Sequence, residues 1–472
     1  MPYDAKQLDD VFGAGSEGDV STRARLSSRS FVRGLDLLTF DESAKAKGRR
    51  LTALEALEAY GLAALIEVAT EGAAVISSST NAVGRVLRQR RADLGLETGY
   101  VASAAGLRPE VVEALERSAR RPVREYERVA RVLGLDERML SFRGEPVGNQ
   151  DIAVRMRTLH DDKPALRGAV VAALSEASWV AMTQVRLESA LSLPGPDVTF
   201  DQEGFYGSGA IPAFRVGYDL ADRLRSKLGL DDAPIDSMRE LMERRLRIPI
   251  VQAELGDQLA GATIVSGDRR AVVVNLSGRN RNVFVRRSTL AHELCHILFD
   301  PREQLRDLRV DEYDDLERRE DQVPDPVEQR ANAFAVQLLL PRAVAKERHS
   351  RAQADALLQL IERFGVSFTA ARYQIWNSME RAFPLEGCRV SREPVAADWE
   401  GREAYTATWH PIPSLVGHPS RAGRFSAVVY RAAKDCLVSW DTAAEWLYSS
   451  ENELRSDAVS TAMMELYPDL LA

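Results

Sequence analysis

Two histidines and one glutamate lie close together where the sequence reads His292-Glu293-Leu294-Cys295-His296. The surrounding residues are apolar and favour a helix, and positions four apart on a helix lie on nearly the same face. His292 and His296 can therefore offer two imidazole nitrogens to one metal ion. Glu293 lies close enough to polarise a water molecule on that metal and to take its proton. This HExxH pattern predicts a hydrolytic metal centre.

A second segment, residues 328–341, supplies a candidate for a third ligand. It reads EQRANAFAVQLLLP, and its apolar residues at helical spacing, ended by Pro341, predict a helix with one buried face. A catalytic zinc has three protein ligands and one open position. Glu328 is the natural third ligand, and Asn332, one turn later, can orient a ligand through a hydrogen bond. The alternative is that both segments are solvated surfaces, and their occurrence together argues against it.

These two segments, RRSTLAHELCHILF and then ExxANAFAVQLLLP, resemble the ImmA/IrrE family of bacterial metallopeptidases. The resemblance also covers the upstream stretches ADRLRSKLGLDDAPIDSMRELMERRLRIPIVQAEL and ATIVSGDRRAVVVNL, and it runs from about Tyr218 to about Met379. It implies a zincin-like, gluzincin-type metallo-endopeptidase domain with a small β-sheet and the HExxH helix. Cys295 stands where the family usually has glycine, and we expect it to be a small buried side chain rather than a ligand.

The resemblance implies zinc as the cofactor, held by His292, His296 and Glu328, with Glu293 as the catalytic base. Mn²⁺ or Fe²⁺ would also fit two imidazoles and a carboxylate. The same glutamate would pass the proton on to the leaving amine. The oxyanion of the reaction needs a further donor, and the sequence does not choose among Arg372, Tyr373 and Tyr313.

Residues 83–142 predict a second unit of four or five short helices, because their helical periods are broken at Gly95, Gly106 and residues 120–122. The strings VASAAGL, RPEVVEALE and YERVARVLGL resemble the XRE (Cro/C1-type) family of DNA-binding proteins. This resemblance implies a five-helix helix-turn-helix domain, and Pro109 suits the first turn of its recognition helix.

The resemblance places basic residues of this unit near a DNA backbone, namely Arg108, Arg117, Arg120 and Arg121. Three features depart from the family. Residues 97–98 are Glu-Thr where Ser-Gln or Thr-Gln is usual, Glu110 and Glu113 would be repelled by phosphate, and residues 116–118 replace the usual Glu-x-Gly. Two hypotheses therefore stay open: a DNA reader, or a helical module for dimerisation or for binding a protein partner.

Composition limits the class of protein. A chain of 472 residues has room for about two to four domains, and a net charge of −8 argues against a general nucleic-acid coat while allowing a local basic patch. Three scattered cysteines do not make a disulfide framework. The N-terminus lacks the features of a signal peptide, and the apolar stretch 51–76 contains four glutamates, so we expect a cytoplasmic protein without a membrane span.

The predicted fold class is α+β and mainly helical. We expect an N-terminal helical and partly disordered region at residues 1–80, with loose order to residue 50, and an XRE-type domain at 81–145. A helical linker at 146–210, the metallopeptidase at 211–380 and a small α/β sensor or regulatory domain at 381–472 would follow.

Two further groups of residues carry weaker signals. Cys388, His410 and His418 can be interpreted as a metal or inhibitory cluster, but their spacing matches no metal motif. The acidic run 311–321 is typical of a solvated loop, with a gate over the cleft as the alternative.

Together the resemblances imply a zinc-dependent regulatory endopeptidase. Its expected substrate is a specific repressor or antitoxin with a helix-turn-helix domain, cut to switch on a stress, prophage or defence response. Operator DNA and a second copy of the chain are further candidate partners. The competing hypotheses are a DNA-binding transcription regulator whose peptidase domain is a sensor or scaffold, and an antitoxin-like binding protein.

Overall fold

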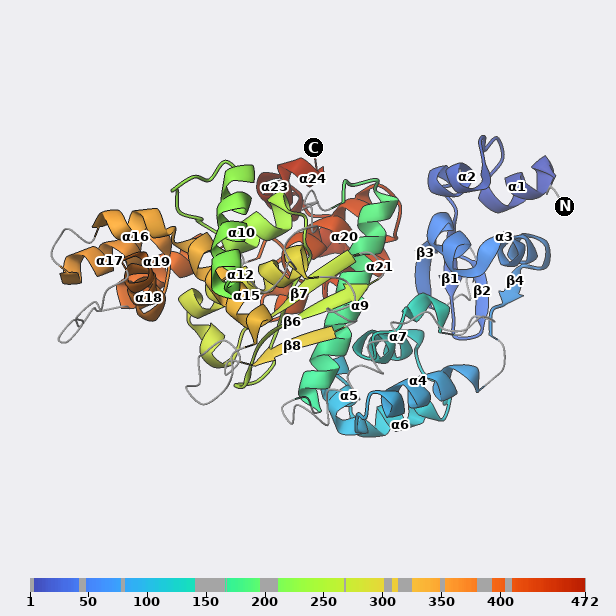
Figure 1. The fold of residues 1–472 in the computed structure, drawn as a ribbon. Coiled ribbons are helices and arrows are strands. Elements are labelled where there is room, and N and C mark those ends of the chain that lie inside the picture. Colours follow the sequence, from blue (N-terminus) through green and yellow to red (C-terminus); the bar gives the residue numbers. More distant parts are fainter. Residues whose placement is uncertain are drawn as a thin grey trace. The chain divides into compact units, whose positions relative to one another are not determined.

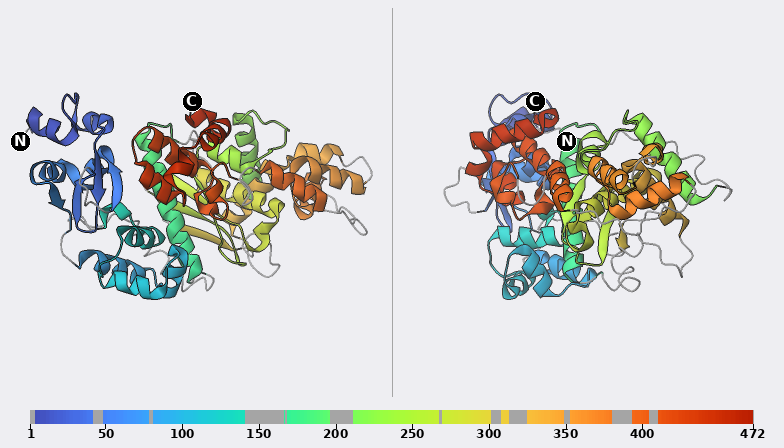
Figure 2. Two further views of the ribbon diagram at one scale, coloured as in Figure 1. Left: turned by 180° about the vertical axis from the view of Figure 1, so that it is seen from behind. Right: turned by 90° about the vertical axis from the view of Figure 1, so that its left-hand side faces the viewer.

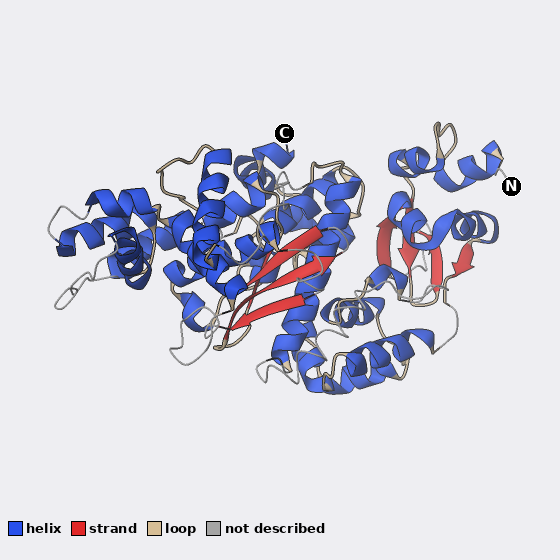
Figure 3. Cartoon of the chain, in the orientation of Figure 1, coloured by secondary structure: helices blue, strands red, loops and turns tan. Residues whose placement is uncertain are grey.

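The computed structural model describes residues 4–41, 48–77, 81–140, 166, 168–195, 211–266, 269–300, 308–312, 325–348, 353–379, 393–403 and 410–471. Within these residues the protein is mainly helical and contains two four-stranded sheets, as Figures 1 and 3 show. The chain divides into two compact units. The first unit consists of residues 1–194 and 407–472, and the second of residues 195–406. The domain boundaries expected from the sequence stay predictions.

The N-terminal part of the first unit contains a small antiparallel sheet of strand order β3-β1-β2-β4. The elements of this part are α1 (Ala5–Phe12), α2 (Val20–Leu26), β1 (Ser30–Arg33), β2 (Leu37–Phe40), β3 (Arg49–Thr52), α3 (Ala53–Glu71) and β4 (Ala73–Val75). Backbone pairing between the strands and the burial of Phe31 and Leu38 stabilise this sheet. Helix α3 begins with a capping box between Thr52 and Glu55 and is interrupted at Gly61, whose φ is 76°. The expectation of loose order up to residue 50 was therefore wrong for the described residues.

A group of short helices follows, and its helices lie where the sequence predicts them. They are α4 (Ala82–Asp93), α5 (Thr98–Ala105), α6 (Pro109–Glu116), α7 (Val123–Val132) and the 3₁₀ turn η1 (Glu137–Met139). Helix α5 ends at Gly106 in the left-handed region (φ 65°), and Pro109 opens α6. Buried Leu87, Val101 and Val112 come from the first three of these helices. The membership of this group in the XRE family stays a prediction.

The C-terminal residues belong to the first unit, where α20 contacts the long helix α9 (Ala169–Ala190); both can be followed in Figure 2. The C-terminal elements are η4 (Pro413–Leu415), η5 (Pro419–Arg421), α20 (Arg424–Lys434), α21 (Trp440–Trp446), α22 (Glu451–Leu454), α23 (Asp457–Leu466) and α24 (Pro468–Leu471). The described part of residues 407–472 is thus helical, and the strands expected of an α/β domain are not seen in it. Its apolar residues follow a helical period, as in α20, whose buried face includes Phe425 and Val429.

Ion pairs of two buried glutamates, Glu127 and Glu445, join three parts of the first unit. Glu127 on α7 accepts hydrogen bonds from Arg33 and Arg49, which lie on β1 and β3. On α21, Glu445 accepts hydrogen bonds from Arg128 and Arg131 of α7, both 2.9 Å long. A buried charge without a partner would be costly, so each pair holds its two elements together.

The second unit is built around a mixed sheet of order β5-β7-β6-β8, in which only β5 and β7 are parallel. Its elements are α10 (Ala213–Lys227), α11 (Met238–Glu240), the π-helical turn η2 (Leu241–Arg245), β5 (Ile250–Ala253), β6 (Leu259–Ser266), β7 (Arg269–Asn275), η3 (Gly278–Arg281), α12 (Val283–Phe299), β8 (Leu308–Glu312), α15 (Pro326–Leu339), α16 (Arg342–Arg348), α17 (Gln353–Phe364), α18 (Phe368–Met379) and α19 (Glu393–Arg402).

Helix α12 occupies the centre of this unit, because it contacts both the sheet, through β6 and β7, and helix α15. Its Ala291, Leu294 and Cys295 are fully buried in the apolar core, as expected of Cys295. Phe299 at its end packs edge-on against Phe334 of α15, with ring centroids 5.5 Å apart. This packing fixes the relative positions of the two helices that carry the HExxH motif and Glu328. None of the described helices has the length and apolar content that a membrane span needs.

Candidate metal centre

The three expected ligands come together in the second unit. His292 and His296 lie one turn apart on α12, with their Nε2 atoms 2.9 Å from each other. Glu328, in the first turn of α15, places one carboxylate oxygen 3.2 Å from Nε2 of His292 and the other 3.8 Å from Nε2 of His296. Two ligand atoms at about 2.0–2.1 Å from a tetrahedral zinc would lie about 3.3 Å apart. The three side chains are therefore close enough to hold one metal ion.

Hydrogen bonds to the other ring nitrogens fix how the imidazoles are protonated. Nδ1 of His292 lies 2.9 Å from Oδ1 of Asn332, and Nδ1 of His296 lies 2.8 Å from Oδ2 of Asp300. An amide oxygen and a carboxylate oxygen both accept, so each Nδ1 carries the proton and each Nε2 has a lone pair. Two lone pairs and a carboxylate facing one another repel unless a cation lies between them. The donor set therefore fits Zn²⁺ or a similar divalent metal.

The carboxylate of Asp300 is itself held in place. It is buried and forms an ion pair with Arg330, which comes from the same helix as Glu328. Arg270 on β7 donates to the backbone carbonyls of His296 (3.3 Å) and Asp300 (3.1 Å) and so secures the end of α12. Sequence reasoning missed these three residues, although the position of Asp300 one turn after His296 was a usable signal.

Glu293 follows His292 on α12, and its carboxylate faces strand β6. It is fully buried, and its Oε2 accepts a hydrogen bond of 2.7 Å from Oγ1 of Thr263. Its Oε1 lies near Gly261, where an added Cβ atom would be 3.0 Å away. The expected base thus has one carboxylate oxygen fixed by the sheet.

The local sequence explains why both helices begin where they do. Asn282 caps α12 by accepting from the backbone N–H of Phe284 (2.9 Å), and Asp325 caps α15 by accepting from Val327 (2.8 Å). Pro326 occupies the first position of α15. Glu328 therefore lies in the first turn, where the partial positive charge of the helix N-terminus favours a carboxylate.

The remaining chemical candidates lie elsewhere or stay undecided. Arg372 and Tyr373 are both exposed on α18, and Tyr313 lies outside the described residues. The structure therefore does not choose an oxyanion donor among them.

The proposed cluster of Cys388, His410 and His418 is not seen as such. Cys388 lies outside the described residues. His410 is buried in the first unit, where its Nδ1 accepts from the backbone of Ile412 at 3.1 Å. His418 stacks on Tyr448 at 4.1 Å between ring centroids, and burial and then Arg421 lower its pKa. Both histidines thus have contacts that belong to the packing of the C-terminal helices. Most of the acidic run 311–321 also lies outside the described residues.

The four arginines expected near DNA, Arg108, Arg117, Arg120 and Arg121, are all exposed on the helical group. Two of them contact carboxylates of their own helix or turn. Arg121 makes two hydrogen bonds to Glu125, of 2.7 and 2.8 Å, and Arg117 lies 3.8 Å from Glu113. Such exposed pairs are weak, but they reduce the positive charge that this face offers to phosphate.

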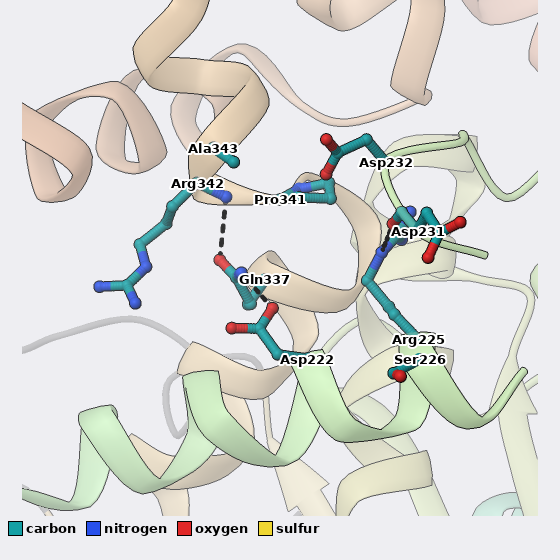
Figure 4. A pocket seen from close by; sticks show the side chains of 9 residues that line it. All are labelled: Asp222, Arg225, Ser226, Asp231, Asp232, Gln337, Pro341, Arg342 and Ala343. Atoms are coloured by element: carbon teal, nitrogen blue, oxygen red, sulfur yellow. Dashed lines mark hydrogen bonds between the residues drawn. The ribbon is translucent and has the colours of Figure 1, made fainter. Parts of the chain in front are cut away.

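A hollow of about 460 Å³ lies on another side of the second unit (Figure 4). Its lining residues are Asp222, Arg225, Ser226, Asp231, Asp232, Gln337, Pro341, Arg342 and Ala343. Within it, Gln337 donates to Asp222 (2.6 Å) and accepts from the backbone of Arg342 (3.1 Å). Gln337 follows Glu328 by nine positions, which places it about 14 Å along α15 and on the opposite face of the helix. The hollow is therefore separate from the metal centre.

Comparison with known proteins agrees with this geometry. No match to the chain is found among the curated proteins. Residues 264–375 match the model of the family described as Peptidase_M78, IrrE N-terminal-like domain. The matched segment covers about a quarter of the chain and contains His292, Glu293, His296, Glu328 and Asn332. This part of the chain is thus similar to metallopeptidases of the ImmA/IrrE type.

Proposed function

We propose that the chain is a zinc-dependent endopeptidase that cuts one specific protein, a repressor or antitoxin with a helix-turn-helix domain. The cut would switch on a stress, prophage or defence response. One observation carries the enzymatic part: two imidazoles and a carboxylate converge within metal-binding distance, inside the segment that matches a peptidase family. The resemblance of the helical group to XRE proteins supports the substrate class, because such domains pair with their like.

The mechanism follows from the chain's own side chains. His292, His296 and Glu328 would hold the metal, which when bound lowers the pKa of a water molecule and polarises a peptide carbonyl. Glu293 accepts a proton from the attacking water and later delivers it to the leaving amine, so one carboxylate serves as base and then as acid. Asn332 keeps the lone pair of Nε2 on His292 directed at the site.

The proposal is tested by comparing protein N-termini, by mass spectrometry, in cells that express the wild type or Glu293→Gln, with and without DNA damage. We expect a few new N-termini that depend on the wild type and lie in a protein with a helix-turn-helix domain. New termini in an unrelated protein would overturn the substrate class and leave the peptidase intact. The absence of any wild-type-dependent terminus under both conditions would contradict the peptidase itself.

A second candidate function is DNA binding by the helical group. The exposed Arg108 and Arg120, on either side of α6, favour it, while the exposed Glu110 and Glu113 on α6 oppose it. In this alternative the peptidase-like unit serves as a sensor or scaffold. Sequence-specific retention of the full chain on DNA, with no wild-type-dependent cleavage, would support it.

A further inference from the structure

Strand β6 presents two residues to the catalytic helix. Gly261 and Thr263 are two positions apart on this strand, and side chains two apart in a strand point to the same face. The Thr263 side chain is fully buried, and its hydroxyl donates to Oε2 of Glu293 at 2.7 Å. The two residues are 30 positions apart in sequence, so this hydrogen bond joins the sheet to helix α12.

Gly261 leaves the space that the carboxylate occupies. A Cβ atom at this position would lie 3.0 Å from Oε1 of Glu293, 3.1 Å from the carbonyl oxygen of Val273 and 3.3 Å from Cγ2 of Thr289. The carbonyl of Val273 belongs to β7, which is paired with β6 along the ladder from Gly261 to Ser266. Because this carbonyl belongs to the backbone of a paired strand, it cannot move away from an added methyl group as the end of a flexible side chain could.

Strand β6 is a rigid support for such a contact. It lies inside the sheet, paired antiparallel with β7 on one side and with β8 on the other. A threonine in a strand is ordinarily explained by its β propensity alone, and buried hydroxyls often bond to nearby backbone. Here the hydroxyl instead meets an ionisable side chain of another element, and a hydrogen bond to a carboxylate is stronger and more directional than a neutral one.

We propose that Thr263 is the positioning residue for Glu293. Its hydroxyl fixes Oε2, and Gly261 leaves room for Oε1, so the orientation of the carboxylate is set from strand β6. This inference rests on the proposed peptidase function and adds to it the residue that sets the orientation of the base. Precise placement matters because an error of about 1 Å in a reacting group costs up to about 100-fold in rate.

The test compares Thr263→Val, which keeps the shape and removes the donor, with Thr263→Ser, which keeps the donor. Thr289→Val is the matched control, because Thr289 is equally buried, lies one turn before Glu293 and bonds to Asn280 at 3.1 Å. Each full-length variant is assayed for bound zinc and for kcat and KM on the protein whose wild-type-dependent N-terminus is found in cells. Urea unfolding of Thr263→Val, Glu293→Ala and the double variant measures the coupling of the two side chains independently of activity.

We expect Thr263→Val to bind one zinc as the wild type does, with kcat lowered about 10- to 100-fold and KM unchanged. Thr263→Ser should recover most of this loss, and Thr289→Val should keep the wild-type kcat. The unfolding effects of Thr263→Val and Glu293→Ala should not add. Equal kcat for Thr263→Val and wild type, or additive unfolding effects, would overturn the positioning role while the peptidase stands. If the wild type cuts no protein, the proposed function fails and the positioning role fails with it.

Discussion

At the scale of single residues, the centre consists of ligands and of the side chains that orient them. The Asp300 carboxylate accepts from Nδ1 of His296 and is paired with Arg330, so it connects the second histidine of α12 to helix α15. Such outer contacts fix the tautomer and direction of a ligand, and their loss weakens metal binding without removing a ligand.

We therefore predict that Asp300→Ala lowers the affinity for zinc by about 10- to 100-fold. The imidazole of His296 loses its acceptor at Nδ1, and Arg330 loses its buried partner. Competition with a chromophoric chelator measures the affinity directly. Exposed Asp398, which pairs with Arg402 at 3.5 Å, provides the control variant Asp398→Ala, whose affinity should equal that of the wild type. An unchanged affinity in Asp300→Ala would show that His296 is oriented by other contacts.

The sequence allowed the prediction of His292, Glu293, His296 and Glu328 because their spacing within two helices is local. Asn332 was also predictable, one turn after Glu328. Thr263, Arg270 and Arg330 were not, since each acts on α12 from another element and its role depends on tertiary packing. No period or spacing in the chain encodes those contacts.

At the scale of elements, the approach of β6 to α12 is limited by Gly261. We predict that Gly261→Ala destabilises the protein by about 1–3 kcal/mol, because the new methyl group meets the carbonyl of Val273 and the carboxylate of Glu293. Urea unfolding followed by circular dichroism measures the change. The control is Gly99→Ala in α5, where nothing lies within 4 Å of the added atom and alanine favours the helix. Equal stability of Gly261→Ala and wild type would contradict the close packing.

The contact between α7 and α21 predicts a dependence on pH. Burial alone would raise the pKa of Glu445, but Arg131, Arg49 and Arg128 outweigh it and lower the pKa to about 2. A depressed pKa in the folded state stabilises the protein above the ordinary pKa of about 4.5, and this stabilisation is lost as the pH falls toward 2.

Glu445→Gln should therefore cost roughly 3 kcal/mol of unfolding free energy at pH 7, and less at pH 3. Thermal or urea unfolding of the variant and the wild type at both pH values measures the two differences. The surface glutamate Glu465 on α23 offers the control Glu465→Gln, which should be neutral at both. A larger difference in unfolding free energy between Glu445→Gln and the wild type at pH 3 than at pH 7 would show that the arginines do not hold Glu445 ionised.

Helices were more predictable than strands. Apolar residues recur through α9, α12 and α15 over 14 to 22 residues, and Asn282, Asp325 and Pro326 mark where α12 and α15 begin. The strands of the N-terminal sheet have three or four residues each, too few for a visible alternation, and they become stable only by pairing with one another. That sheet was therefore not predictable from the sequence.

At the scale of the whole molecule, a net charge of −8 and the paired arginines of the helical group oppose tight binding to DNA. We predict that the full chain binds duplex DNA only weakly at about 150 mM salt and more weakly as salt is added, because contacts to phosphate are electrostatic. Fluorescence anisotropy with a labelled duplex at two salt concentrations measures this. The double variant Arg108→Ala/Arg120→Ala should lose this weak binding to the duplex. Tight, sequence-specific binding at that salt concentration would favour the transcription-regulator alternative.

The role of Glu293 is tested by comparing purified Glu293→Gln with the wild type, on the protein identified in cells. The substitution keeps the size of the side chain and a polar partner for Thr263, and it leaves His292, His296 and Glu328 in place. We predict one zinc per chain in both proteins and a loss of cleavage of about 100-fold or more in the variant, because an amide does not accept the proton of the attacking water. Cleavage by Glu293→Gln at the wild-type rate would contradict the assignment of Glu293 as the base, and with it the proposed peptidase mechanism.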